Sequence, residues 1–390
     1  MRSHVDVDRL VELTSALVAV DTRNPPGNEV AAAGVARDAL AAWQPAWTEV
    51  EPAPGRRSLV AAIPHPDGPG ERPTLIVNGH LDVVGVRREQ WSGDPFGPWV
   101  AGGRLYGRGT ADMKGGVAAA ICALDALARS GGVPGWDVVF HLVADEEAGG
   151  TLGTRALLDA GLIRGDACLV PEPTGMAVCT AERGLLQARL SVHGLGGHGS
   201  RPGDAVSAIE HAARVALALH AADFGEEHPL LGRPSANVGT IEGGSGVNTV
   251  AESCVLGVDR RVLPGVSPES AMGSLRARVE AAGVEGLRYE LEEIAFGEGS
   301  ELPASHPWAG DVRAAVRSVT GTEPATIGMS FTTDARFVRN QAGIPAVVCG
   351  PGEIAQAHTT DEWVAIDQLV DATAAFAALM ATAPAWWTAP

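Results

Sequence analysis

The sequence is short of basic residues. Lys and Arg together number 29 against 47 for Asp and Glu, which gives a formal net charge of −18. Nucleic acids and anionic membranes attract positive charge, so this balance argues against non-specific binding to either of them. We therefore expect no nucleic-acid partner and no membrane partner.

Long apolar runs are also absent. No run approaches the roughly 20 apolar residues that a membrane-spanning helix requires. The first ten residues are charged and lack the apolar core and the small-residue cleavage site of a secretory signal. The sequence therefore predicts a cytoplasmic protein.

Cysteines are few and scattered. The five are Cys122, Cys168, Cys179, Cys254 and Cys349. They are odd in number and no two are spaced as C-x-x-C, so the sequence predicts neither a disulfide framework nor a zinc site made of thiolates.

At 390 residues the chain is longer than one hydrophobic core usually supports. Short β-branched strands alternate with helical patterns such as the Ala-rich residues 117–128. This alternation predicts an α/β fold with a mostly parallel sheet covered by helices. The Trp- and Gly-rich residues 91–107 are expected to be irregular. The first strands are expected at residues 74–77, 138–144 and 167–170.

The pattern changes between Arg183 and Ile294. The expected elements follow the order β-α-β-β-α-β, which is that of a ferredoxin-like unit. We expect residues 183–294 to form a separate α+β domain inserted into the first one, which comprises residues 1–182 and 295–390. Its first helix is predicted to be capped by Asp204. The face of that helix expected to be buried consists of Val206, Ile209, Ala213 and Leu217.

Three consecutive carboxylates, Asp145, Glu146 and Glu147, follow a predicted buried strand. Unpaired like charges are costly to desolvate, so the triplet indicates a bound cation. Ligand sites in parallel sheets form beyond the carboxyl ends of the strands. Other polar residues at strand ends or on strand-to-helix connections are His80, Asp112 and Glu172.

Histidines and carboxylates together are a ligand set that suits zinc and also cobalt or manganese. So many acidic side chains can hold two divalent ions if one carboxylate bridges them, and paired ions activate water for amide hydrolysis. Asp82, two residues after His80, can orient the imidazole. If the backbone is extended there, adjacent Glu146 and Glu147 must diverge, so one can bind metal while the other takes a proton from the attacking water.

A nucleotide-binding alternative rests on Gly107-Arg108-Gly109. This segment lacks the third glycine at the required spacing and does not directly follow the first strand. A dinucleotide site is therefore not indicated.

Several motifs, taken in order, resemble the dizinc aminoacylase/carboxypeptidase family. That family includes acetylornithine deacetylase, succinyl-diaminopimelate desuccinylase and glutamate carboxypeptidase. The motifs span nearly the whole chain and are specific as a set. They are His80-Leu81-Asp82, residues 107–116, Asp145-Glu146-Glu147, residues 171–174, residues 196–199 and residues 350–362.

The resemblance implies two zinc ions. His80 and Glu172 would bind one, Glu147 and His358 the other, and Asp112 would bridge them. Glu146 would be the general base and Asp82 would support His80. The resemblance also implies a cis peptide bond between Asp112 and Met113.

The resemblance further implies that the inserted domain is a lid that mediates homodimerisation. His198 would reach the oxyanion in the neighbouring subunit, although it could be only a surface residue of a Gly-rich loop. Asn248 and Arg261 match positions that contact substrate, Arg261 by a bidentate grip on a carboxylate. Arg261 could instead form only a surface ion pair.

The sequence therefore predicts a zinc-dependent amidohydrolase or metallopeptidase acting on an N-acyl amino acid or a peptide-like small carboxylate. Residues 330–336 and 350–358 resemble the deacetylase and desuccinylase branch more closely, which favours a deacylase. An exopeptidase of the glutamate carboxypeptidase or dipeptidase type is the alternative. A non-catalytic binding or assembly protein of the same fold is the rival from another class, and the intact ligand set with Glu146 counts against it.

Overall fold

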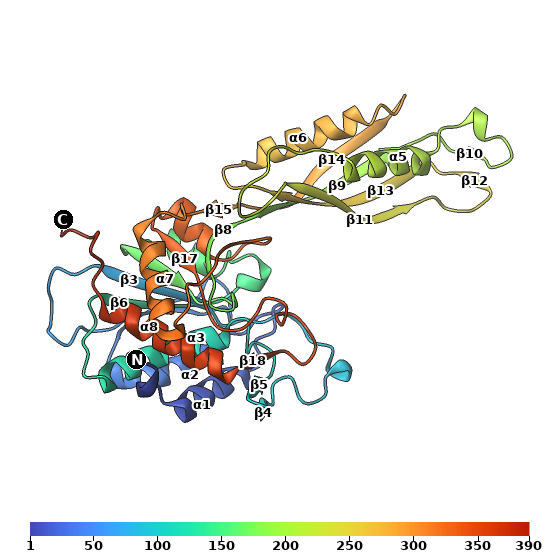
Figure 1. Ribbon diagram of the computed structural model, residues 1–390. Coiled ribbons are helices and arrows are strands. Elements are labelled where there is room, and N and C mark those ends of the chain that lie inside the picture. Colours follow the sequence, from blue (N-terminus) through green and yellow to red (C-terminus); the bar gives the residue numbers. More distant parts are fainter. Residues whose placement is uncertain (390) are drawn as a thin grey trace. The chain divides into compact units, whose positions relative to one another are not determined.

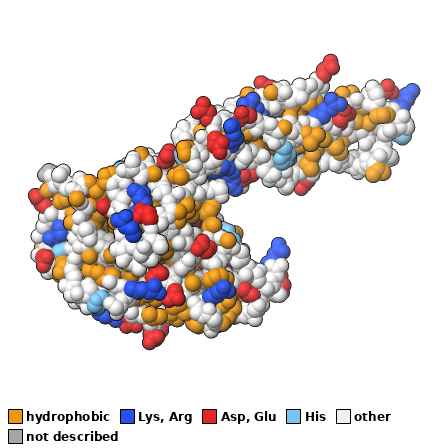
Figure 2. Space-filling model, in the orientation of Figure 1, with side chains coloured by type: hydrophobic (Ala, Val, Ile, Leu, Met, Phe, Trp, Pro, Cys, Tyr) orange, Lys and Arg blue, Asp and Glu red, His pale blue; other side chains and the backbone are white. Residues whose placement is uncertain are grey.

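The computed structural model describes residues 1–389, which divide into two compact units (Figure 1). The first unit contains residues 1–180, 302–327 and those from 333 onward, and the second contains residues 181–301 and 328–332. Among residues 1–389, no helix has both the length and the apolar character needed to cross a membrane. Acidic and basic side chains are interspersed over the face shown in Figure 2.

A mixed sheet forms the centre of the first unit. Its middle strands pair in parallel, β6 with β3, β3 with β7, and β7 with β17. Antiparallel strands extend it, with β1 and β2 beyond β6 and with β8 beyond β17. The α/β prediction is confirmed, but fewer of the strands are parallel than expected. The antiparallel outer strands are short and give a weak sequence pattern, so the sequence did not predict them. The strands are β1 (Ala46–Val50), β2 (Ser58–Ala62), β3 (Thr74–His80), β6 (Asp137–Val143), β7 (Ala167–Val170), β8 (Val178–Glu182) and β17 (Ala346–Val348). The short strands β15 (Ser300–Glu301) and β16 (Thr326–Met329) pair with β8.

Helices pack one against another beside this sheet. α3 is the most buried of them and lies against α1 and α8, while α7 packs on α8 and β17 (Figure 1). The small Ala and Gly residues of α3 allow this close packing on several sides. The helices of this unit are α1 (Val7–Val18), α2 (Val30–Leu40), α3 (Lys114–Arg129), α4 (Thr154–Asp159), α7 (Pro307–Thr320) and α8 (Ile366–Ala381).

Residues 91–107 are more regular than predicted. Strands β4 (Trp99–Ala101) and β5 (Arg104–Tyr106) form a hairpin, and β18 (Trp363–Ala365) pairs with β5. Gly102 and Gly103 both have positive φ and make its two-residue turn. The two-glycine turn was the signal for this hairpin. The small sheet brings residue 362 next to the loop that carries Asp112.

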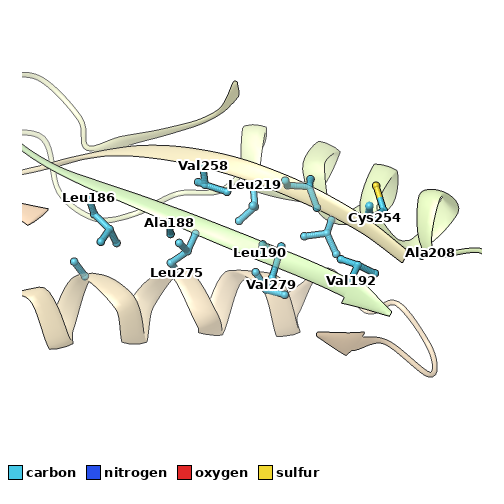
Figure 3. Close-up of a cluster of buried hydrophobic side chains, with 14 of the residues drawn as sticks. Leu186, Ala188, Leu190, Val192, Ala208, Leu219, Cys254, Val258, Leu275 and Val279 are labelled. Carbon is cyan, nitrogen blue, oxygen red and sulfur yellow. The ribbon is translucent and has the colours of Figure 1, made fainter. Parts of the chain in front are cut away.

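The second unit is a four-stranded antiparallel sheet with two helices packed on one face. The elements follow the β-α-β-β-α-β order that the sequence predicts, and the sheet order is β11-β13-β9-β14. Apolar residues including Leu186, Leu190 and Val279 fill the space between sheet and helices (Figure 3). The elements are β9 (Gly184–His193), α5 (Ala208–His220), β11 (Ser235–Gly243), β13 (Ser253–Val262), α6 (Pro268–Ala281) and β14 (Arg288–Gly297), with a short ribbon of β10 (Gly197–His198) and β12 (Thr249–Val250).

The prediction for α5 is wrong in two respects. The capping residue is Ser207, whose side chain accepts the N–H of Glu210, and not Asp204. The predicted inner face is exposed, with Ile209 at 43% and Leu217 at 73%. The helix has two apolar rows at helical spacing, and spacing alone does not say which row meets the sheet. The buried row is Ala208, Ala212, Val215 and Leu219.

Candidate metal centre

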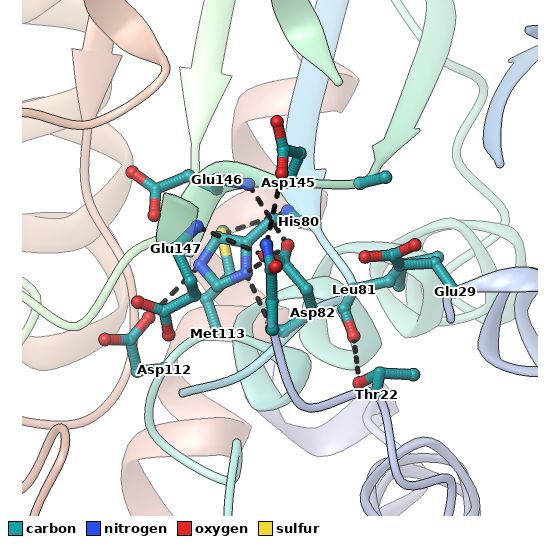
Figure 4. A network of polar contacts seen from close by, with 12 residues as sticks. Thr22, Glu29, His80, Leu81, Asp82, Asp112, Met113, Asp145, Glu146 and Glu147 are labelled. Atoms are coloured by element: carbon teal, nitrogen blue, oxygen red, sulfur yellow. Dashed lines mark hydrogen bonds and ion pairs between the residues drawn. The ribbon is translucent and has the colours of Figure 1, made fainter. Parts of the chain in front are cut away.

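Three parallel strands bring the predicted ligands to one edge of the sheet. His80 is the last residue of β3, the acidic triplet follows β6, and Glu172 lies two residues beyond β7. Because β3 pairs in parallel with both β6 and β7, the carboxyl ends of all three lie together. Figure 4 shows His80, Asp112 and Glu147 pointing toward one another at this edge.

The five predicted ligands form two trios that share Asp112. The Nε2 atom of His80 lies 3.2 Å from Oδ1 of Asp112 and 3.5 Å from Oε1 of Glu172. The Nε2 atom of His358 lies 3.3 Å from Oδ2 of Asp112 and 3.1 Å from Oε2 of Glu147. Within each trio the ligand atoms all lie within 4.8 Å of one another.

This donor set fits divalent metal ions. Nitrogen and carboxylate oxygen donors converge from several sides, as zinc prefers. Among the described residues, Oε1 of Glu147 is buried and has no hydrogen-bond partner, which leaves a lone pair available for a ligand bond. The peptide bond between Asp112 and Met113 is cis, as the resemblance implied.

The electrostatics of the cluster call for a cation. Burial, together with repulsion from Asp112, raises the pKa of Glu172 to about 8. The same two causes raise the pKa of Glu147. Hydrogen bonds to Asp112 and Glu147 raise the pKa of His358 to about 10. Positive metal charge would stabilise the ionised carboxylates of this cluster.

Glu146 is beside the two trios but in neither of them. Desolvation of its carboxyl group, with repulsion from Glu172 and Asp334, raises the pKa of Glu146 well above its usual value. A carboxyl group with a raised pKa can receive a proton and hold it near neutral pH, which is what a general base must do.

Asp82 holds the backbone of the acidic triplet. Its Oδ1 and Oδ2 atoms accept the N–H groups of Glu146 and Glu147, each at 3.2 Å. The Nδ1 atom of His80 lies 3.0 Å from the backbone oxygen of Asp82 and 3.6 Å from Oδ1. The hydrogen-bond partner of His80 is thus the backbone oxygen of Asp82 rather than the carboxylate that was expected to orient the imidazole, and the carboxylate positions the neighbouring acidic residues.

A buried polar network behind Asp82 was not found from the sequence. The Nη2 atom of Arg56 lies 2.8 Å from Oε1 of Glu29 and 3.0 Å from Oδ1 of Asp145. Asn24 donates through Nδ2 to Asp82 at 2.9 Å and to Asp145 at 3.2 Å. The residues after Asn24, Pro25-Pro26-Gly27, are typical of a turn, but no local pattern assigns Asn24 partners so far along the chain.

The other predicted substrate contacts lie in the second unit. His198 pairs with Thr249 across the short ribbon, which brings it beside Asn248, and its Nδ1 atom lies 2.8 Å from Oγ of Ser200. The Nε atom of Arg261 donates to Oδ1 of Asp259 at 2.8 Å. The surface ion pair that was the alternative for Arg261 is therefore formed.

The fold and the two trios together are those of an α/β metallohydrolase. Comparison with known proteins gives the family. The model of peptidase family M20/M25/M40 matches residues 76–382, and the chain belongs to that family. It is accordingly an enzyme, a hydrolase of a metallopeptidase and amidohydrolase family.

Two curated relatives cover most of the chain. A succinyl-diaminopimelate desuccinylase from Delftia acidovorans is 33% identical over 76% of this chain and 78% of its own length. An acetylornithine deacetylase from Vibrio atlanticus is 31% identical and covers 82% of each chain.

Solved structures show the same fold. Aminopeptidase PepT from Bacillus cereus has a TM-score of 0.81 and 21% identity, covering 97% of this chain and 98% of its own. A dinuclear metal-binding peptidase of the M20 family from Bacillus subtilis has a TM-score of 0.70 and 16% identity, covering 96% of this chain and 97% of its own.

Proposed function

We propose that the chain is a dizinc amidohydrolase. His80 and Glu172 would hold one ion, Glu147 and His358 the other, and Asp112 would bridge them. The observation that carries this proposal is that the two oxygens of Asp112 face different histidines, at 3.2 Å and 3.3 Å. When bound, two such ions supply an activated water and polarise the substrate carbonyl. Cobalt or manganese would suit the same nitrogen and oxygen donors.

Glu146 is proposed as the general base. Its carboxylate would take a proton from the attacking water and donate it to the nitrogen of the departing amine. The raised pKa of Glu146 supports this role because the protonated carboxyl group is then stable between the two transfers. Asp82 would keep Glu146 in place through its backbone N–H.

The favoured substrate is an N-acyl amino acid, so that the reaction is a deacylation. The support is that relatives at 31% and 33% identity are named as a deacetylase and a desuccinylase. The structural neighbours named as peptidases are less similar in sequence, and they make an exopeptidase the second candidate. His198, Asn248 and Arg261 are proposed to contact the substrate, with Arg261 exchanging Asp259 for the substrate carboxylate.

A homodimer through the second unit is part of the proposal. The outer row of α5 exposes Ile209 and Leu217, and Val247 nearby is fully exposed. Burying such side chains against a second copy would stabilise a dimer, at about 25 cal/mol per Å² of apolar surface removed from water. His198 would then act in the neighbouring subunit. A cytoplasmic location stays a prediction from the sequence.

One experiment separates these readings. Purified protein is analysed for bound metal and then assayed on a panel of N-acetyl amino acids, N-succinyl amino acids and dipeptides. A deacylase hydrolyses the N-acyl amino acids fastest, and an exopeptidase the dipeptides. Two bound metal ions with no hydrolysis of any amide would favour the non-catalytic alternative.

A further inference from the structure

Glu362 is a buried carboxylate that belongs to neither of the two ligand trios. It precedes β18, four residues after His358, and its exposed fraction is 0%. A carboxylate in such a place is costly to desolvate unless several donors satisfy it. The hydrogen bonds of Glu362 therefore indicate its role.

All of its described contacts are made with the loop that leads to Asp112. The Oε1 atom of Glu362 accepts three backbone N–H groups, from Gly109 at 3.1 Å, from Ala111 at 2.9 Å and from Asp112 at 3.1 Å. The Oε2 atom accepts from Nη1 of Arg108 at 2.5 Å. The backbone oxygen of Glu362 also accepts the N–H of Gly107 at 2.9 Å.

We infer that Glu362 is a positioning residue that fixes the shared ligand Asp112 relative to His358. The loop from 107 to 112 has no strand or helix of its own, and its hydrogen bonds to Glu362 include one from the backbone N–H of Asp112 itself. One side chain thereby ties the bridging carboxylate to the segment that supplies a histidine of the second trio. Hydrogen bonds to a full negative charge are shorter and about twice as strong as neutral ones.

The inference rests on the proposed dinuclear centre and deepens it. Because Asp112 belongs to both trios, a displaced Asp112 weakens both metal positions at once. A change at a residue that serves a single trio would weaken one position first. Loss of outer contacts to metal ligands typically costs 10–100-fold in metal affinity.

A structural alternative is that Glu362 only neutralises the buried Arg108, whose side chain also lies over the ring of Trp91. The two interpretations predict different metal binding in a double variant. Replacing both members of a buried ion pair by apolar residues is often tolerated. If the ion pair were the whole role, Glu362→Leu combined with Arg108→Met would restore metal binding as well as stability.

The test measures zinc binding in the absence of substrate. Wild type, Glu362→Leu, the Glu362→Leu/Arg108→Met double variant and Glu182→Gln are dialysed against buffered free zinc, and bound zinc and melting temperature are recorded. Glu182 is a matched control because it is a buried carboxylate that accepts from Ser300 and belongs to neither ligand trio. We expect both zinc ions to bind 10–100-fold more weakly in Glu362→Leu, unchanged binding in Glu182→Gln, and recovery of melting temperature but not of zinc affinity in the double variant.

Zinc affinity restored to the wild-type value in the double variant, or unchanged in Glu362→Leu, would overturn the inference. Glu362→Asp covers the case in which the leucine variants do not fold. Aspartate keeps the charge beside Arg108 but withdraws the oxygen from the three N–H groups by one methylene. It should fold and bind zinc more weakly, and wild-type affinity would contradict the inference. Wild-type protein that binds no zinc would instead refute the proposed function.

Discussion

The carboxylate of Asp82 accepts the backbone N–H of Glu146 at 3.2 Å. Asp82, two residues after the proposed ligand His80 at the end of β3, thus holds the residue proposed as the general base after β6. The same carboxylate accepts the N–H of Glu147, a proposed ligand. Asp82 therefore links the position of the proposed base to that of a proposed ligand.

We expect Asp82→Asn to lower kcat/KM by about 10–100-fold, which is the usual effect of losing an outer contact in a metal site. One carboxylate oxygen becomes an NH2 group, which cannot accept an N–H and faces one instead. Kinetic assays on the preferred N-acyl amino acid, with melting temperature as the control for folding, measure the effect. An Asp82→Asn variant with wild-type kinetics would show that these hydrogen bonds of Asp82 have no role in catalysis.

Glu146→Gln should lower kcat by roughly 10²–10⁴-fold, the contribution typical of a general base. Glutamine has nearly the same shape but cannot accept the proton from water. Glu146 is outside both ligand trios, so the variant should retain the metal content of the wild type. Elemental analysis beside the kinetics separates the two roles, and loss of metal together with activity would make Glu146 a ligand rather than the base.

Arg56→Met should destabilise the fold by about 3–5 kcal/mol, because it leaves Glu29 buried without its charge partner. Adding Glu29→Gln should recover much of that stability. Activity should recover less, because Asp145 still lacks its contact with Arg56. Urea unfolding and kinetics of the single and double variants provide the measurement, and full recovery of both would mean that Arg56 serves Glu29 alone.

His141 predicts a pH dependence of stability. It is fully buried in β6, neither ring nitrogen has a hydrogen-bond partner among the described residues, and burial lowers its pKa to about 4. The unfolded chain takes up a proton near the ordinary histidine pKa of about 6.5. The unfolded state therefore gains protons first, and stability is lost as pH falls from about 6.5 toward 4.

The variant His141→Leu should lack this component. The difference in unfolding free energy between variant and wild type should grow in favour of the variant, by roughly 2 kcal/mol between pH 7 and pH 5. Urea denaturation at the two pH values tests this. A difference that does not change with pH would mean that His141 is hydrated or paired.

The sequence predicts that the proposed ligands lie close together, but it does not predict the residues that position them. His80, Glu147 and Glu172 stand at the ends of buried strands, and a parallel sheet brings such ends together whatever the details of packing. Glu362 and Arg56 carry no such signal. Their partners lie far along the chain, and only the packing of separate loops brings them together.

Packing choices also explain the errors in the fold. The buried face of α5 could not be chosen, because Ile209 and Leu217 form an apolar row as regular as the one that is buried. Strands β4 and β5 are only three residues long each, so their sequence pattern is hard to distinguish from that of a loop. The long strands β9 and β13 alternate clearly between buried and less buried residues, and both occupy their places in the β-α-β-β-α-β order that the sequence predicts.

The central claim is that two metal ions share Asp112. Anomalous diffraction from zinc-loaded crystals at the zinc absorption edge tests it most directly. The account predicts two peaks about 3.5–4 Å apart, one between His80 and Glu172 and one between Glu147 and His358, with an oxygen of Asp112 at each. A single peak, or zinc bound away from Asp112, would contradict it.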